Sequence, residues 1–114
     1  MKRLWRIVAA LVVVGLVWLE PVVSRAQSGS VVTIQVFQFQ PNPLEVKAGA
    51  QVTWTNQDDI EHTVTSGTPE RPDGRFNSVL AGKGKTASFT FKEAGMYSYF
   101  CNRHQSMRGQ INVK

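Results

Sequence analysis

A short segment near the carboxyl end, rich in sulfur and nitrogen ligands, places the strongest constraint on how this chain can fold. It reads CNRHQSM from Cys101 to Met107, and Cys101 is the only cysteine in the 114 residues. The three-residue spacing of thiol, imidazole and thioether lets one turn direct the side chains of Cys101, His104 and Met107 toward a single centre. The only other histidine, His62, lies far upstream in a Thr-rich segment. A fold that uses these residues together must bring His62 beside the loop that follows Cys101.

Apolar and polar residues alternate along most of residues 31–114, as they do in half-buried strands. The alternation is clearest in Thr86–Phe91. In Val31–Phe39 the apolar face changes phase at Phe37, which predicts a bulge or a sharp bend. Residues 67–74 hold two prolines and two glycines and are interpreted as an exposed loop. With about eight short segments separated by turn residues, we expect an all-β fold, an antiparallel Greek-key β-sandwich.

The first 26 residues have the layout of a secretory signal peptide. A basic start precedes an apolar run from Ile7 to Leu19, and small residues surround Ala26. The run is short for a helix that spans a bilayer, which needs about 20 residues, and a leader kept as a membrane anchor is the alternative. We expect cleavage before Gln27, a flexible tail at 27–30, and an exported or periplasmic protein.

The basic character of the chain lies mostly in this leader. The whole sequence holds 13 Lys+Arg and 8 Asp+Glu, a formal net charge of +5. Loss of residues 1–26 removes four basic residues and one acidic residue. The remaining chain then holds 9 Lys+Arg and 7 Asp+Glu, a formal net charge of +2. A charge this small is no argument for nucleic-acid binding. An exported chain with one cysteine must keep a free thiol, pair with another chain or bind a metal.

Two imidazoles, one thiolate and a distant thioether are the ligands of a mononuclear blue-copper site. Residues two apart in a strand share a face, so His62 and Cys101 can both point inward at strand ends. Structural zinc sites use four strong ligands, usually several thiolates, and gain nothing from a thioether. Each residue alone has a simpler structural explanation, but the combination does not. We therefore predict one copper ion at a type 1 site formed by His62, Cys101, His104 and Met107.

The sequence resembles the cupredoxins, small type 1 blue-copper proteins, and among them the plastocyanin/amicyanin-like group. The resemblance spans residues 31–114 and is carried by the ligand spacing and by VKAG at 46–49, VTWTN at 52–56, HTVT at 62–65 and GMYSYFC at 95–101. It implies that His62, Cys101 and His104 are the strong ligands and that Met107 is the axial one. It also implies that the ring edge of His104 faces solvent and carries the electron out.

The chain departs from the family pattern around the ligands. Glu61, Arg103 and Gln105 stand where prolines are common, and Thr63 stands where relatives often have Asn. The resemblance implies that the backbone N–H of Thr63 approaches the sulfur of Cys101. The polar replacements predict a docking surface more polar than is usual. With Arg103 and Arg108 near the exit histidine, we expect the partner face to be acidic.

These observations predict an exported monomer, not itself an enzyme, that carries single electrons between redox proteins in transient encounters. The alternative is copper storage or delivery, which needs an exchangeable site. An enzyme of the copper oxidase kind needs further histidines, which only another chain can supply, and a metal-free module leaves the ligand set unexplained. The acidic residues before His62, namely Asp58, Asp59 and Glu61, are interpreted as a solvated turn and not as acid–base catalysts.

Overall fold

The computed structural model describes residues 15, 16 and 30–114. The predicted signal peptide at 1–26 and the predicted tail at 27–30 therefore lie almost entirely outside the described residues. Within the part that is described, no helix is long and apolar enough to cross a membrane. The folded part begins with a strand at Ser30.

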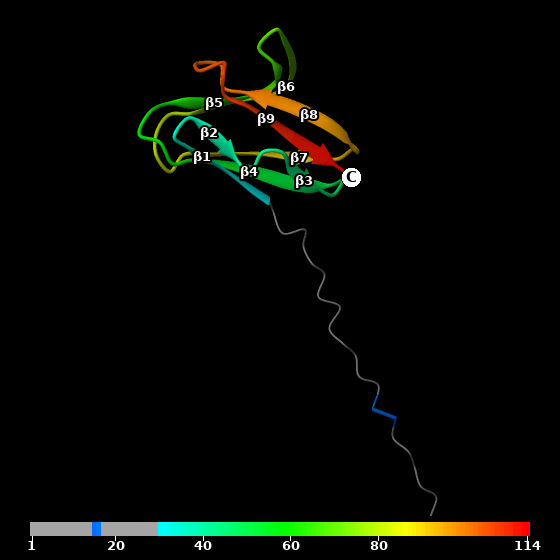
Figure 1. The fold of residues 1–114 in the computed structure, drawn as a ribbon. Helices are drawn as coiled ribbons and strands as arrows, with labels where there is room; N and C mark the ends of the chain where they lie inside the picture. The colour runs from blue at the N-terminus through cyan, green and yellow to red at the C-terminus, as the bar shows by residue number, and fades with distance from the viewer. Residues whose placement is uncertain (1–14, 17–29) are drawn as a thin grey trace, which may run out of the picture.

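Nine strands of the described residues form two sheets that pack face to face (Figure 1). The first sheet has the strand order β2-β1-β4-β7 and the second has the order β3-β9-β8-β5-β6. In chain order the strands are β1 Ser30–Gln35, β2 Gln38–Gln40, β3 Leu44–Val46, β4 Ala50–Asn56, β5 His62–Thr68, β6 Arg71–Leu80, β7 Thr86–Phe91, β8 Gly95–Phe100 and β9 Arg108–Val113.

The predicted all-β sandwich is confirmed, with differences in detail. The sheets are mixed and not purely antiparallel, because β1 runs parallel to β4 and β3 runs parallel to β9. Residues 67–74 are not an irregular loop: most of them belong to the outer part of the β5–β6 hairpin, where Gly67 pairs with Pro72. The prediction that their side chains are exposed holds from Arg71 to Gly74. The polar composition of residues 67–74 correctly predicted exposed side chains. It did not reveal that the backbone of this segment remains paired as two strands.

The change of apolar phase in residues 31–39 marks a reversal of the chain. Gln35 pairs with Gln38, so Val36 and Phe37 form a two-residue hairpin turn with φ angles of 51° and 58°. A hairpin turn with positive φ at both central residues usually contains Asn-Gly or a similar pair. A β-branched Val at positive φ is sterically unfavourable. Contacts from outside the hairpin must therefore stabilise this turn.

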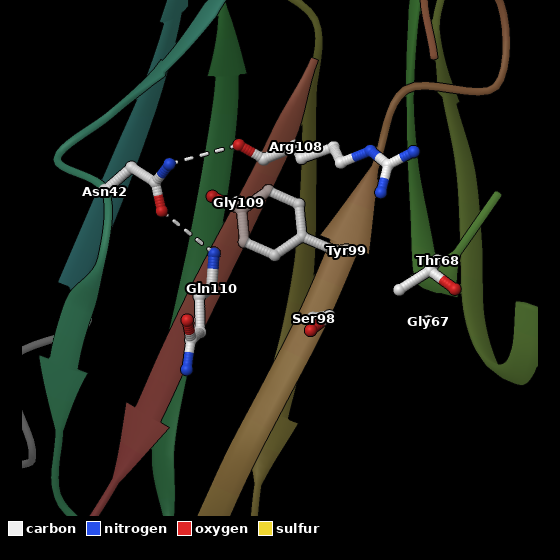
Figure 2. A pocket seen from close by; sticks show the side chains of 8 residues that line it. All are labelled: Asn42, Gly67, Thr68, Ser98, Tyr99, Arg108, Gly109 and Gln110. Carbon is white, nitrogen blue, oxygen red and sulfur yellow. Dashed lines mark hydrogen bonds between the residues drawn. The ribbon is translucent and has the colours of Figure 1, made fainter. Parts of the chain in front are cut away.

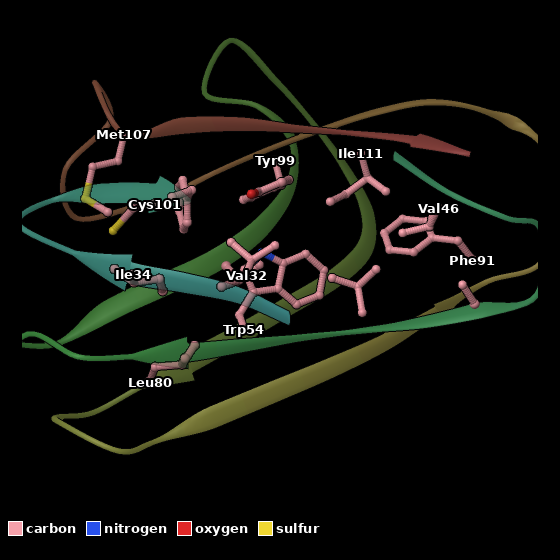
Figure 3. Close-up of a cluster of buried hydrophobic side chains, with 14 of the residues drawn as sticks. Val32, Ile34, Val46, Trp54, Leu80, Phe91, Tyr99, Cys101, Met107 and Ile111 are labelled. Atoms are coloured by element: carbon pink, nitrogen blue, oxygen red, sulfur yellow. The ribbon is translucent and has the colours of Figure 1, made fainter. Parts of the chain in front are cut away.

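The apolar core lies between the two sheets and runs the length of the sandwich (Figure 3). Trp54 of β4 contacts Tyr99 of β8 across the core, with ring centroids 5.3 Å apart. The ring of Tyr99 lies across Gly109 of β9 (Figure 2), where any side chain would overlap it. Beside this contact, Asn42 ties the loop before β3 to β9, since its Oδ1 accepts the N–H of Gln110 at 3.0 Å.

Candidate metal centre

Three of the four predicted metal ligands come together at one end of the sandwich. The ligand atoms of His62, Cys101 and His104 all lie within 4.8 Å of one another. The Cys101 Sγ atom is 3.7 Å from Nδ1 of His62 and 3.7 Å from Nδ1 of His104. His62 and Cys101 are completely buried, whereas His104 is half-buried. One histidine is thus sealed inside the protein and the other reaches its surface.

Strand ends position these ligands. His62 is the first residue of β5, Cys101 directly follows β8, and the two strands are neighbours in the five-stranded sheet. The loop after Cys101 is closed by backbone hydrogen bonds: the N–H of Cys101 donates to Met107 at 3.0 Å, and the N–H of Met107 donates to His104 at 2.8 Å. These bonds fold residues 101–107 into a compact turn. The ligand spacing read from the sequence therefore corresponds to one closed loop.

Met107, the fourth predicted ligand, lies at the same end of the core. Its side chain is 4% exposed and belongs to the same buried cluster as Cys101. Figure 3 shows the sulfur atoms of Met107 and Cys101 together at this end, far from Val46 and Phe91 at the other. The thioether of Met107 therefore lies at the same end of the core as the thiol of Cys101.

Thr63 links the ligand loop to β5 in two ways. Its backbone N–H donates to Cys101 Sγ at 3.3 Å, which confirms the contact expected from the family resemblance. Its hydroxyl oxygen accepts the N–H of Asn102 at 2.7 Å. Thr63 therefore provides the brace between the loops at the position where relatives often have Asn. An N–H donated to a thiolate stabilises its negative charge and so tunes the properties of a bound metal.

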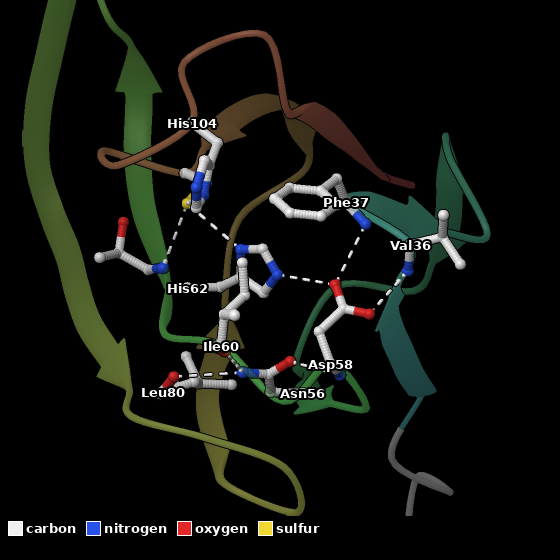
Figure 4. Close-up of polar contacts among 10 residues, drawn as sticks. Val36, Phe37, Asn56, Asp58, Ile60, His62, Leu80 and His104 are labelled. Atoms are coloured by element: carbon white, nitrogen blue, oxygen red, sulfur yellow. Dashed lines mark hydrogen bonds and ion pairs between the residues drawn. The ribbon is translucent and has the colours of Figure 1, made fainter.

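Asp58 holds the outer side of His62 (Figure 4). Its Oδ2 atom is 2.7 Å from His62 Nε2, and its carboxylate also accepts the N–H groups of Val36 and Phe37 at 2.8 and 3.1 Å. Burial disfavours the charged carboxylate, but the hydrogen bonds from Phe37, His62 and Val36 together hold the pKa of Asp58 below its ordinary value. The interpretation of Asp58 as part of a solvated turn is therefore wrong. For its neighbour Asp59 the same interpretation agrees with the structure, because that side chain is exposed.

The ring of Phe37 covers both histidines. Its centroid is 5.4 Å from that of His62 and 4.9 Å from that of His104, with interplanar angles of 87° and 89°. Phe37 itself is 48% exposed. The β1–β2 turn thus places the half-exposed Phe37 side chain beside the two histidines (Figure 4).

The charges around the half-buried His104 are paired. Arg103 forms an ion pair with Glu61, and Arg108 forms one with Glu70 at 2.8 Å. The hydrogen bond from Arg108 holds the pKa of the exposed Glu70 carboxyl below its ordinary value. Each arginine that the sequence places near His104 therefore has a carboxylate partner. The net positive charge at this surface is smaller than the sequence suggested.

The donor set and its spacing fit a copper ion. With bond lengths like those at zinc, about 2.0 Å to an imidazole nitrogen and about 2.3 Å to a thiolate, trigonal geometry places N and S about 3.7 Å apart. The separations from Cys101 Sγ to the Nδ1 atoms of His62 and His104 have this value. Two histidines and one cysteine in a trigonal arrangement, with a thioether nearby, define a type 1 copper site. The cluster is therefore that of a blue-copper protein on a β-sandwich.

Comparison with known proteins agrees with this fold and site. Residues 26–114 match the model of the copper binding proteins, plastocyanin/azurin family. A plastocyanin from Scenedesmus fuscus is 34% identical over 97 residues, covering 78% of this chain and 93% of the relative, and an amicyanin from Paracoccus denitrificans is 33% identical over 89 residues, covering 78% and 68%. A purple cupredoxin from Nitrosopumilus maritimus superposes with a TM-score of 0.69 at 28% identity, covering 75% of this chain and 99% of that one. The chain belongs to the plastocyanin/azurin family of copper-binding proteins.

Two residues of the site were not identified from the sequence. Asp58 carried a signal, a carboxylate four residues before a candidate ligand, but acidic residues in turns are usually solvated. For Phe37 the sequence offered only the change of apolar face within residues 31–39. That change does not indicate the direction of the Phe37 ring. The contact between Asp58 and His62 is local, but the contacts that join Phe37 to Asp58 and to the two histidines connect segments that are distant in the chain.

Proposed function

We propose that this protein is an exported carrier of single electrons, with one copper ion that cycles between Cu(I) and Cu(II). Its ligands would be Nδ1 of His62, Sγ of Cys101 and Nδ1 of His104, with the sulfur of Met107 as a weak axial ligand. The observation that carries the proposal is the convergence of the first three atoms within 4.8 Å at a site of which two residues are completely buried. Its relatives plastocyanin and amicyanin support the same assignment.

The residues of the site divide the work of an electron carrier. Copper, when bound, supplies the one-electron redox couple. His62, Cys101 and Met107 are buried and exclude water, and the loop that joins Cys101 to Met107 is closed by its own hydrogen bonds. His104 is half-buried and offers the shortest covalent route from the site to the surface. A rigid set of ligands needs little rearrangement when the charge on the metal changes.

Storage or delivery of copper is less well supported. Rapid exchange of a metal requires ligands that open to solvent or to a receiving protein. Here His62 and Cys101 are completely buried, and His62 is further held by Asp58. These features favour slow metal release, which suits a resident cofactor and not a cargo.

The decisive experiment adds Cu(II) to residues 27–114 and records visible absorption and electron paramagnetic resonance spectra. We expect an intense thiolate-to-copper band and a narrow copper hyperfine splitting, both lost in Cys101→Ala. Asp59→Asn, which alters an exposed carboxylate near the site, should leave both unchanged. An ordinary Cu(II) spectrum from the unsubstituted protein would refute the proposal.

We propose that the redox partners dock transiently on the surface around His104, with the protein acting as a monomer. Exposed Phe37 and Ile60 lie at this end, and Arg103 and Arg108 are paired with carboxylates. The expected preference for an acidic partner is therefore small, and the association rate should change by less than about tenfold between low and moderate salt. Stopped-flow measurements over a range of ionic strength test this, and a steep fall in rate would show that the unpaired positive charge is larger than proposed.

A further inference from the structure

The carboxylate of Asp58 receives hydrogen bonds from three donors on two different segments. Its Oδ1 accepts the N–H of Val36 at 2.8 Å, and its Oδ2 accepts the N–H of Phe37 at 3.1 Å and lies 2.7 Å from His62 Nε2. The side chain of Asp58 is 14% exposed. One partly buried carboxylate thus joins the β1–β2 turn to a candidate metal ligand (Figure 4).

The turn needs such a contact. Val36 and Phe37 have φ angles of 51° and 58°, in the left-handed region that favours Gly and Asn. They also leave two N–H groups directed away from the hairpin, and Asp58 accepts both. Without these bonds, the turn would lose its stabilising partner, and Phe37 would lose its fixed place against the rings of His62 and His104.

The ring of His62 needs the same contact. An ionised carboxylate only accepts hydrogen bonds, so Nε2 of His62 must carry a proton. In a neutral imidazole the other nitrogen, Nδ1, then keeps its lone pair. That atom faces Cys101 Sγ at 3.7 Å. The contact with Asp58 therefore selects the tautomer that directs a lone pair toward the other ligands.

Asp58 is itself held in place from the opposite side. Its N–H donates to Oδ1 of Asn56 at 2.9 Å, and the amide of Asn56 donates to the carbonyl oxygen atoms of Ile60 and Leu80 at 2.8 and 3.2 Å. Asn56 is completely buried. The carboxylate is thus presented from a rigid support, as a positioning group requires.

We infer that Asp58 is a positioning residue that fixes the tautomer of His62 and locks the β1–β2 turn, with the Phe37 ring, over the metal centre. The inference rests on the proposed function for its relevance to copper, but the arrangement itself belongs to the metal-free protein. It predicts that one side chain controls two things at once: which ring nitrogen of His62 is free, and how firmly residues 36 and 37 are held.

Asp58→Asn is the sharpest variant because it has nearly the same shape. If its amide oxygen takes the place of Oδ2, its NH₂ group meets the N–H of Val36. If the amide is reversed, its NH₂ group meets the N–H of Phe37. Neither orientation accepts from all three donors. Asp58→Glu keeps the acceptor atoms and is the conservative variant, and Asp59→Asn makes the same change of charge one residue away at an exposed side chain.

The test uses the metal-free protein at neutral pH. Nitrogen-15 spectra of the histidine rings should show His62 mainly as the Nε2–H tautomer in the original protein and in Asp59→Asn, with a clear shift in Asp58→Asn and partial recovery in Asp58→Glu. Amide hydrogen exchange of Val36 and Phe37 should accelerate at least about tenfold in Asp58→Asn, with loss of the hydrogen bonds. A merely structural role would lower stability without changing the tautomer.

A second measurement extends the test to the metal. Competition with a chelator should show copper affinity reduced by about 10–100-fold in Asp58→Asn, as for other groups that orient a ligating histidine. The inference is overturned if Asp58→Asn and Asp59→Asn have the same His62 tautomer and the same exchange rates. Failure of the proposed function would give a different result. The unsubstituted protein would then show no blue-copper spectrum. The measurements on the metal-free protein would still decide the role of Asp58.

Discussion

The two ends of the sandwich are held together by different kinds of contact. At the end away from the ligands, Val46, Ala50, Phe91 and Val113 are buried apolar side chains. At the ligand end four buried residues of the described chain are polar, and each has a hydrogen-bond partner: Asn56, His62, Thr63 and Thr65. Apolar packing is not directional and tolerates changes of similar volume. Hydrogen bonds to buried groups depend on particular atoms, so the ligand end should be the less tolerant in function.

The largest expected effect comes from the apolar end. Phe91 is 1% exposed and contacts Trp54, and Phe91→Ala should lower the free energy of unfolding by about 3–5 kcal/mol because it leaves a cavity. The copper spectrum should stay the same, since the ligands lie at the other end of the core. Denaturant titration and visible absorption together test this. A shifted absorption band would show that the two ends are coupled and would break the comparison.

A smaller loss of stability with a larger loss of function is expected at the ligand end. Asn56→Ala removes the acceptor for Asp58 and the donors to Ile60 and Leu80, and should cost about 1–3 kcal/mol. Metal should also leave faster, because the support of Asp58 is lost. Chelator-driven copper release measures this.

The control for that experiment is Asn112→Ala in β9, where the amide oxygen accepts a hydrogen bond from Gln110 on the same strand. It should change stability by less than about 0.5 kcal/mol. Equal release rates from the two variants would mean that the polar contacts at the ligand end do not secure the metal.

The smallest effect concerns a polar atom inside the apolar region. The hydroxyl of Tyr99 is buried in the core, where the Tyr99 ring packs against Trp54, and burial raises the pKa of Tyr99 to about 12. Above pH 10 the unfolded chain therefore loses this proton before the folded protein does, and stability falls as pH rises from 10 toward 12. At pH 11 the loss is roughly 1 kcal/mol.

Tyr99→Phe should remove this alkaline loss and change stability little at pH 7. Tyr97→Phe is the matched variant, because the Tyr97 hydroxyl donates to the carbonyl of Glu93 at 2.8 Å and is not buried in the core. Unfolding titrations between pH 7 and 11 decide the matter. An unchanged alkaline slope in Tyr99→Phe would show that this hydroxyl is not the group responsible.

Local patterns predicted the parts of the molecule that depend on neighbours in the chain. The spacing from Cys101 to Met107 predicted a closed loop, and alternation in segments such as Thr86–Phe91 predicted strands. Patterns could not reveal that β1 lies parallel to β4, because pairing of distant strands leaves no trace in either strand alone. The turn at Val36 and Phe37 was not recognised because its usual residues, Asn and Gly, are absent.

The position of β9 has a consequence for the order in which the protein can fold. β9 lies between β3 and β8, and among the described strands β3 pairs with β9 alone. All four candidate ligands precede β9 in the chain, so each has been synthesised before the strand that completes their sheet. β3 can therefore pair only after β9 has been synthesised, and more than sixty residues separate the end of β3 at Val46 from the start of β9 at Arg108. Such distant pairings make folding slow, on the scale of milliseconds to seconds. The chain therefore remains open, with its thiol and imidazoles accessible, for longer than a helical protein of this size would.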